Sequence, residues 1–358
     1  MKRTITISIE QLDRPQPGGI ATYVRGLATG LDSLSDPSLD VVGLAPRGAT
    51  VDPELPLRAV NAPCGVRLLT KLWAMWPLGV PSNSNVVHAT SMAGPFGGGS
   101  SSAVHSVAMH DLLWRDEPDI STPAGIRFHD HRLRLIAERE DLRVIVTSPG
   151  LRQRLVEVGI DESRIHSVRL GVDEDLFNAA SATSVRELLA EHGVPGPFTL
   201  YAGTREPRKN IERLIEAHAV AHATSPELGP LVLAGPSGWG GVATGDATVL
   251  GLVPRDLLLG LYRDATVFAY VPRAEGWGLP PVEALHAGTR VVASATTPSV
   301  ASNDQVVRVD PLDVESIAQG LVGALSDGVD DASRLARFES VADLTWRNVA
   351  LDHLAAWQ

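Results

Sequence analysis

The sequence predicts an α/β protein with two doubly wound parallel sheets, in two domains that face each other across a cleft. Short apolar runs, typical of buried parallel strands, alternate with segments of helical periodicity. This alternation occurs in two successive series of similar length, without a short internal repeat. The chain has 358 residues, which is more than one hydrophobic core usually supports.

The first series defines a domain predicted to comprise residues 1–178. Its expected strands are 4–9, 40–44, 58–60, 85–90, 103–108, 142–148 and 164–168. Its expected helices are 21–34, 65–80, 128–137 and 150–158. Gly18 and Gly19 join the first strand to the first helix. They form either a simple flexible turn or a loop whose amides close over a ligand.

The second series defines a domain predicted to comprise residues 184–344. Its expected strands are 198–202, 231–235, 249–253, 265–271, 290–294 and 306–309. Helices are expected at 185–192, from 211 onward, at 255–262, from 280 to 288 and at 314–325. A last amphipathic helix lies within residues 345–358.

Composition restricts the classes of function. The formal net charge of -11 argues against nonspecific nucleic-acid binding. Cys64 is the only cysteine, which excludes an intramolecular disulfide and agrees with a cytoplasmic location. The sequence has no apolar run of about eighteen residues, so no transmembrane helix is expected. The segment 65–80 carries tryptophans and cations, so it either packs on its own sheet or contacts a membrane surface, and packing is the commoner outcome.

The stretch 273–288 carries the clearest functional pattern. It leads from one expected strand through a glycine-bearing loop into a helix that begins with Pro280 and Pro281. Amides of such a loop bind phosphate, while Glu275 and Glu283 can accept hydrogen bonds from hydroxyl groups. The pattern therefore favours a nucleotide sugar over a bare phosphate.

A cationic turn follows the first strand of the second domain. Arg205, Arg208 and Lys209 precede an expected helix. Cations repel one another and oppose the dipole at a helix N-terminus, so an anion between them is expected. A pyrophosphate fits this turn.

The sequence from Glu275 to Ala284, EGWGLPPVEA, resembles the paired-glutamate signature of the retaining glycosyltransferases of family 4. The resemblance covers nearly the whole chain and is strongest between Gly203 and Gly288. It implies the GT-B architecture of two Rossmann-like domains, the first on the acceptor side and the second binding the nucleotide sugar, with the segment 345–358 packed back on the first. It also implies retaining transfer of a sugar from a nucleotide diphosphate sugar to a hydroxyl group.

The resemblance also suggests residue roles. Glu275 and His110 would contact the donor sugar, Glu283 the ribose, and Lys209 with Arg205 or Arg208 the diphosphate. The family usually has its arginine directly after the glycine, where this chain has Thr204, so the choice between the two arginines stays open. The remaining donor-binding candidates are Gly18, Gly19, Gly203, Leu250, Val253, Gly276, Trp277, Gly278 and Leu279. The segment 295–303 departs from the family's usual pattern.

The turn Glu206-Pro207-Arg208-Lys209-Asn210 looks most like that of bacterial mannosyltransferases that build surface polysaccharide. GDP-mannose is therefore the first expected donor, ahead of UDP- and dTDP-sugars, and a glycan, a glycolipid or a small molecule the expected acceptor. No cofactor or metal is expected. The alternatives are a noncatalytic nucleotide-binding protein of the same fold, or a nucleotide-sugar epimerase or phosphorylase.

Overall fold

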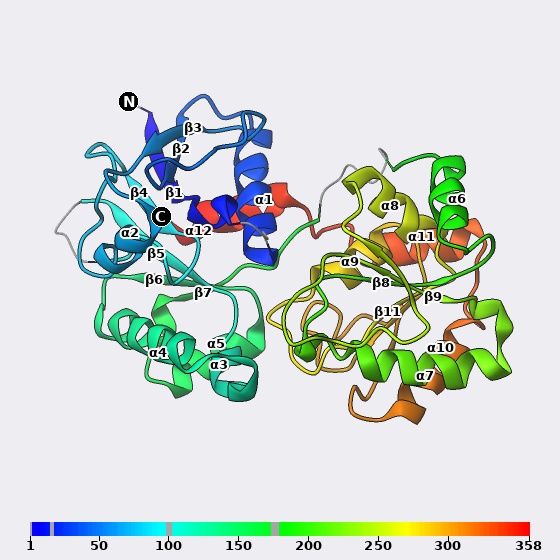
Figure 1. Cartoon of the computed structure of the whole chain (residues 1–358). Coiled ribbons are helices and arrows are strands. Elements are labelled where there is room, and N and C mark those ends of the chain that lie inside the picture. Colours follow the sequence, from blue (N-terminus) through cyan, green and yellow to red (C-terminus); the bar gives the residue numbers. More distant parts are fainter. Residues whose placement is uncertain (1, 15–17, 98–101, 173–178) are drawn as a thin grey trace. The chain divides into compact units, whose positions relative to one another are not determined.

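The computed structural model describes residues 2–14, 18–97, 102–172 and 179–358 and divides the chain into two compact units (Figure 1). Unit 1 comprises residues 1–171 and 344–358, and unit 2 comprises residues 172–343. The division comes slightly before the boundary expected near 178–184. The segment 173–178 lies outside the described residues.

Unit 1 contains a parallel sheet in the order β3-β2-β1-β4-β5-β6-β7. Its strands are β1 (Arg3–Ser8), β2 (Leu39–Ala45), β3 (Arg58–Asn61), β4 (Val86–Ala89), β5 (Val104–Met109), β6 (Arg143–Val146) and β7 (Ile165–Ser167). Its helices are α1 (Gly19–Ser33), α2 (Val66–Leu72), α3 (Leu113–Asp116), α4 (Pro123–Glu138), α5 (Pro149–Glu157) and α12 (Trp346–Ala356). The strand order reverses between β1 and β4, which makes the carboxyl ends of these strands the topological switch point.

Unit 2 contains a parallel sheet in the order β10-β9-β8-β11-β12-β13. Its strands are β8 (Thr199–Ala202), β9 (Leu231–Ala234), β10 (Thr248–Gly251), β11 (Val267–Tyr270), β12 (Val291–Ser294) and β13 (Val306–Val309). Its helices are α6 (Ala182–Glu191), α7 (Ile211–Thr224), α8 (Arg255–Asp264), α9 (Leu279–His286), α10 (Val314–Ala324) and α11 (Asp331–Glu339). Here the order reverses between β8 and β11. The two sheets confirm the predicted fold class.

Helix α12 packs against α1 in unit 1, and two glycines of α1 permit the close approach. A Cβ atom at Gly26 would lie 2.1 Å from the indole of Trp346. One at Gly30 would lie 2.0 Å from the backbone oxygen of Trp346. Any side chain at these positions would therefore push α12 away from α1.

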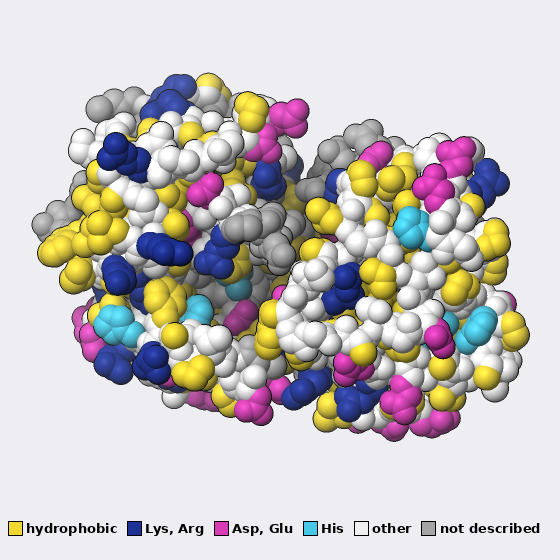
Figure 2. Space-filling model, viewed as in Figure 1, with side chains coloured by type: hydrophobic (Ala, Val, Ile, Leu, Met, Phe, Trp, Pro, Cys, Tyr) yellow, Lys and Arg dark blue, Asp and Glu magenta, His cyan; other side chains and the backbone are white. Residues whose placement is uncertain are grey.

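The expectation of a helix across 65–80 was wrong. Helix α2 ends at Leu72, and turns follow. The buried indole of Trp73 donates from Nε1 to the backbone oxygen of Leu78 at 2.9 Å, and Pro77 cannot continue the backbone hydrogen-bond pattern of a helix. The outer face of this segment stays exposed, and Figure 2 shows hydrophobic side chains beside Lys and Arg over this part of unit 1.

Helix α11 was not predicted, although Ala332, Leu335 and Ala336 have helical spacing. Its start is capped by Asp330, whose carboxylate accepts from the backbone N–H of Ser333 at 2.8 Å. Within the described residues, no helix is long and apolar enough to cross a bilayer.

Candidate functional site

The candidate site lies at the switch point of unit 2, where β8 and β11 are neighbours. The loop after β8 carries the cationic turn, and the loop after β11 carries Glu275. Gly203 and Gly235 follow β8 and β9 with φ of 145° and 134°. A Cβ at Gly235 would lie only 2.3 Å from the backbone oxygen of Gly203. Glycine at 235 therefore lets the two strand ends approach each other closely.

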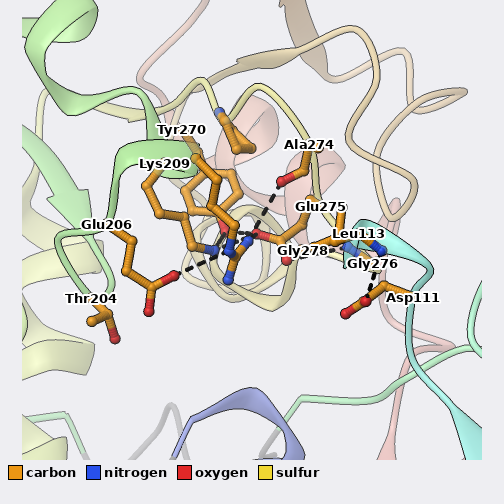
Figure 3. Close-up of polar contacts among 12 residues, drawn as sticks. Asp111, Leu113, Thr204, Glu206, Lys209, Tyr270, Ala274, Glu275, Gly276 and Gly278 are labelled. Carbon is orange, nitrogen blue, oxygen red and sulfur yellow. Dashed lines mark hydrogen bonds and ion pairs between the residues drawn. The ribbon is translucent and has the colours of Figure 1, made fainter. Parts of the chain in front are cut away.

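Lys209, Tyr270 and Glu275 converge at this point (Figure 3). The ammonium of Lys209 donates to the hydroxyl of Tyr270 and pairs with Oε2 of Glu275. Tyr270 donates to the same carboxylate oxygen at 2.5 Å. Arg208 adds a contact from its Nη1 to Glu275 Oε2 at 3.1 Å. Oε2 of Glu275 thus accepts hydrogen bonds from two cations and one hydroxyl group.

The surrounding backbone fixes this cluster. Asn210 adopts a left-handed conformation with φ of 62°. Its amide donates to the backbone oxygens of Val271 and Pro311 at 3.0 and 2.7 Å. The backbone N–H of Arg273 donates to the backbone oxygen of Arg208 at 2.9 Å. The two loops are therefore tied together on either side of Lys209.

The electrostatics of the cluster favour an ionised Glu275. Burial opposes ionisation, but the adjacent charges of Lys209 and Arg208 outweigh it and lower the pKa of Glu275 to about 2. Burial also disfavours the Arg208 cation, yet the carboxylates of Glu275 and Glu206 raise the pKa of Arg208. Burial lowers the pKa of Lys209, and the carboxylate of Glu275 opposes this effect.

The loop before α9 offers backbone amides rather than a side-chain cap. Gly278 precedes the helix with φ of 95°, and no side chain of the described residues caps it. Pro280 and Pro281 have no N–H, so amides for an anion must come from 276–279. The amide of Gly276 already contacts Glu275 Oε1 at 3.2 Å. The site can therefore place amides next to the cations that surround Glu275.

Segment 295–303 supports this loop. Ser299 donates from its hydroxyl to the backbone oxygen of Gly278 at 2.6 Å and from its amide to that of Trp277 at 3.0 Å. A Cβ at Gly278 would lie 2.5 Å from the methyl group of Thr297. Glycine at 278 is thus required both by its backbone angle and by the close contact with Thr297.

Glu283 lies inside α9 and is 8% exposed. Tyr262 donates to its Oε2 at 2.8 Å, and Arg255 pairs with its Oε1 at 2.9 Å. Both carboxylate oxygens therefore already have partners. The Arg255 side chain is 41% exposed, so this ion pair lies near the protein surface.

In unit 1, His110 follows β5 and is half-buried. Its Nε2 donates to the backbone oxygen of Thr90 at 2.9 Å, since a carbonyl can only accept. Burial lowers the pKa of His110, which keeps the ring neutral at pH 7 with a lone pair on Nδ1. The ring also packs edge-on against Tyr23, with centroids 5.0 Å apart.

Tyr23 belongs to a buried hydrogen-bond chain whose proton positions can be deduced. His353 Nδ1 donates to the backbone oxygen of Val349 at 2.8 Å, so the Nε2 of the neutral ring accepts from Tyr23 at 2.7 Å. The oxygen of Tyr23 then accepts from His88 Nε2 at 2.7 Å. His88 Nδ1 accepts from Ser106, whose oxygen accepts from Trp357. Burial lowers the pKa values of His88 and His353 and keeps both rings neutral.

Parts of the chain are similar to known glycosyltransferases. Residues 196–327 match the family model described as glycosyl transferases group 1. The chain is 27% identical over 265 residues to the O-antigen chain mannosyltransferase B of Escherichia coli, covering 70% of this chain and 68% of that protein. It is 28% identical over 264 residues to the serotype-specific mannosyltransferase WbdA of Escherichia coli, covering 69% of this chain and 32% of that protein. The chain thus spans about a third of the length of WbdA.

The solved structure of a sucrose-phosphate synthase from Thermosynechococcus elongatus has the same fold. It matches with a TM-score of 0.73 at 19% identity, covering 99% of this chain and 98% of that chain. The chain has the GT-B fold. The matched range 196–327 contains the cluster around Glu275.

The structure brings together most of the residues proposed for the diphosphate. Arg208, rather than Arg205, lies in the cluster with Lys209 and Glu275. The guanidinium of Arg205 instead donates to the backbone oxygen of Gly235 at 2.8 Å.

The remaining candidates for donor binding lie at strand ends or helix starts. Leu250 lies in β10, which is an edge strand of the unit 2 sheet. Val253 lies just after the carboxyl end of β10. Gly19 begins α1 and Gly18 precedes it, while residues 15–17 lie outside the described chain. A Cβ at Gly18 or Gly19 would meet no atom within 4 Å, so packing among the described residues does not require glycine there.

Three residues of the candidate site were not predicted from the sequence. Tyr270 is the last residue of the buried strand β11. A polar residue at the end of an apolar run could have marked it as a candidate site residue. Glu206 accepts from Arg208 at 3.1 Å, and Arg255 pairs with Glu283. Glu206 lies two residues from Arg208 on the same turn, so this contact could have been expected from the sequence. Arg255 and Glu283 lie on different helices, α8 and α9, so no local pattern revealed their ion pair. Within the described residues, no group of three or more His, Cys, Asp or Glu is placed to hold a metal ion.

Proposed function

We propose that the chain transfers mannose from GDP-mannose to a hydroxyl group of a glycan or lipid-linked acceptor, with retention of configuration. The observation that carries this proposal is the convergence of Lys209 and Arg208 on Glu275 at a strand switch point, beside the amides of 276–279. The names of the two Escherichia coli relatives support mannose as the sugar. The fold and the family model support a nucleotide sugar as the donor.

In the proposed reaction, the bond between the sugar C1 and the β-phosphate oxygen breaks while the acceptor oxygen bonds to C1. The diphosphate leaves with the bonding electron pair, so negative charge increases on its oxygens. Lys209, Arg208 and the loop amides are fixed charges and dipoles aimed at that position, and stabilisation of this kind usually contributes most to catalysis. These groups of the protein take the role that a metal ion has in other transferases.

Glu275 has two roles in this proposal. Without substrate, its carboxylate neutralises the buried Lys209 and the half-buried Arg208 and keeps them in place. With substrate, the diphosphate takes over part of that neutralisation, and Glu275 accepts hydrogen bonds from sugar hydroxyls. Glu283 accepts hydrogen bonds from the ribose hydroxyls. For this to occur, the exposed Arg255 must release the carboxylate oxygen that it contacts.

No protein nucleophile is proposed. The acceptor attacks C1 from the face that the diphosphate leaves, and a phosphate oxygen takes the acceptor proton. The neutral His110 accepts from a donor-sugar hydroxyl through Nδ1, since Nε2 is used by Thr90. Gly18 and Gly19 give the backbone of this loop its freedom to close over the donor.

The test is a panel of GDP-, UDP- and dTDP-sugars incubated with the protein without acceptor. We expect slow release of GDP from GDP-mannose, and a loss of about a hundredfold in Lys209→Met. Binding of nucleotide without any turnover would favour a noncatalytic module, and interconversion of the sugar would favour an epimerase. With an acceptor, NMR of the product should show the α anomer, whereas a covalent sugar–protein adduct in mass spectrometry would refute the single same-face step.

We also propose that unit 1 contacts an anionic membrane surface through the segment 65–80. Leu68, Met75 and Trp76 are 53%, 51% and 59% exposed. Arg67 and Lys71 are exposed on the same segment. Apolar side chains flanked by cations suit insertion between acidic lipid headgroups. Cosedimentation with phosphatidylglycerol vesicles should be lost in Trp76→Ser and Met75→Ser together, and equal binding to phosphatidylcholine vesicles would contradict the proposal.

A further inference from the structure

We infer that Glu10 is the centre of a hydroxyl-binding subsite in unit 1, which holds the acceptor of the transfer reaction. This inference rests on the proposed function, because a sugar transferase must hold a second hydroxyl-bearing substrate. Glu10 follows β1 and begins a short 3-10 helix, Glu10–Asp13. It was not among the residues singled out in the sequence.

The carboxylate of Glu10 is buried and held on one side only. Glu10 is only 2% exposed. Oε1 accepts from the amide of Gln11 at 3.0 Å and from the hydroxyl of Ser91 at 2.9 Å. Gln11 also donates to the oxygen of Ser91 at 3.2 Å, which closes a triangle of contacts. These bonds orient the carboxylate.

Oε2 of Glu10 has no hydrogen-bond partner among the described residues. Glu10 also makes no ion pair with a cation in the described part of the chain. A buried carboxylate oxygen without a donor is costly, and such atoms are rare enough in native proteins to require an explanation. A ligand donor is the explanation that fits the position of Glu10.

That position is the switch point of the unit 1 sheet. Glu10 follows β1 and Ser91 follows β4, the two neighbouring strands between which the strand order reverses. In open α/β sheets, ligands bind at the carboxyl ends of strands at such a point. Ser8 and Thr90 join the two strand ends through three hydrogen bonds of 2.7 to 3.1 Å.

His110 follows β5, the strand next to β4, and is attached to the same edge of the sheet. Its Nε2 donates to the backbone oxygen of Thr90, the residue directly before Ser91. His110, the proposed sugar-binding histidine, is therefore hydrogen-bonded to Thr90. The next residue, Ser91, orients Glu10. An acceptor hydroxyl bound by Glu10 would be held in fixed relation to His110.

The chemistry of the subsite selects a hydroxyl donor. A carboxylate oxygen accepts hydrogen bonds, and Oε1 of Glu10 is already occupied, so Oε2 is the atom that can accept from a ligand. A hydroxyl group donates to such an oxygen and is uncharged. A sugar hydroxyl of the acceptor meets these conditions, and it need not be the attacking one.

The test compares Glu10→Gln with the wild type and with Glu54→Gln, which alters an exposed glutamate of the same unit. Transfer from GDP-mannose to p-nitrophenyl α-mannoside is followed by mass spectrometry, and acceptor-free GDP release is followed in parallel. We expect Glu10→Gln to lower the rate of transfer at low acceptor concentration by about 10- to 100-fold. Its acceptor-free GDP release and its thermal shift with GDP should match those of Glu54→Gln.

Saturation-transfer NMR with methyl α-mannoside gives a second readout that does not require turnover. The signal should be present in the wild type and in Glu54→Gln and strongly reduced in Glu10→Gln. Equal signals and equal transfer in Glu10→Gln, or no wild-type signal at all, would overturn the inference and make Glu10 a structural carboxylate. Absent GDP release with an intact NMR signal would instead count against the proposed transferase.

If Glu10→Gln fails to fold, Ser91→Ala replaces it in both assays. Ser91 orients Glu10 without offering an oxygen to the ligand, because its hydroxyl is already bonded to Glu10. A loss of transfer and of NMR signal in a folded Ser91→Ala protein supports the subsite. Wild-type values of both contradict it.

Discussion

At the scale of single residues, the site depends on how one carboxylate holds two cations. Glu275 accepts from Lys209, Arg208 and Tyr270 through the same oxygen. Removing a partner from a buried charge pair leaves the other charge uncompensated, which is more costly than the pair is stabilising. The cluster is therefore preorganised before any substrate binds.

The two arginines of the cationic turn should differ in their effects. Arg208→Ala removes a cation that lies in the cluster, whereas Arg205→Ala removes one whose side chain contacts the backbone of Gly235. We expect Arg208→Ala to lower turnover of GDP-mannose by roughly a hundredfold and Arg205→Ala by less than about tenfold. Steady-state kinetics of both variants measures this. The reverse order would assign the diphosphate contact to Arg205.

The low pKa of Glu275 predicts a pH dependence of stability. Its value of about 2 in the folded protein lies below the ordinary value of 4.5, so the ionised form stabilises the fold at and above about pH 4.5. This contribution is lost as the pH falls from about 4.5 to about 2. Urea denaturation should find Glu275→Gln less stable than the wild type at pH 7.

The difference in free energy of unfolding between these two proteins should shrink steadily through that pH window. Other carboxylates titrate in both proteins and cancel in the difference. A difference that stays constant from pH 5 to pH 2 would show that the charge of Glu275 is not stabilised by Lys209 and Arg208.

At the scale of elements, α12 is attached to unit 1 by close packing on α1. Gly26→Ala and Gly30→Ala would place a methyl group 2.1 and 2.0 Å from atoms of Trp346. We expect each to destabilise the protein by about 1–3 kcal/mol, because overpacking outweighs the gain in helix propensity. Gly150→Ala in α5 is the control, since its Cβ meets no atom within 4 Å.

Thermal unfolding of the three variants provides the measurement. Gly150→Ala should be neutral or slightly stabilised. If Gly30→Ala were as stable as Gly150→Ala, α12 would not pack on α1 at this distance.

The buried chain through Tyr23 fastens the same helix. Tyr23→Phe would leave the Nε2 atoms of His88 and His353 without their partner. We expect a loss of about 2–4 kcal/mol, because two buried polar groups lose their hydrogen bonds. Chemical denaturation of Tyr23→Phe measures this, with Tyr201→Phe in unit 2 as a comparison. Among the described residues, the hydroxyl of Tyr201 makes one hydrogen bond, to the backbone oxygen of Thr204, so its loss should be smaller.

At the scale of the whole molecule, the alternation of strands and helices was predictable because buried parallel strands appear as short apolar runs. β11 and β12 are buried at every residue, and both were predicted. The expected helix at 65–80 failed because helical spacing of apolar residues continued beyond Leu72, while Trp73 docks into unit 1 and ends the regular structure. Tertiary contacts of this kind leave no periodic signal.

The site was partly predictable for a similar reason. Parallel strands place their carboxyl ends at one edge, so the meeting of Lys209 and Glu275 followed from the order of elements. The position of Arg208 rather than Arg205 in the cluster did not follow, because both lie on the same short turn. Glu10 could not be found either, since its only mark is an oxygen without a donor, which is a property of the folded protein.

The central claim is that the cluster of Lys209 and Glu275 binds the diphosphate of the donor. Isothermal titration calorimetry with GDP and GMP, on the wild type and on Lys209→Met, tests it most directly. We predict that the wild type binds GDP at least roughly tenfold more tightly than GMP, and that Lys209→Met loses this preference while still binding GMP. An unchanged preference for GDP in Lys209→Met would place the β-phosphate elsewhere and contradict the account.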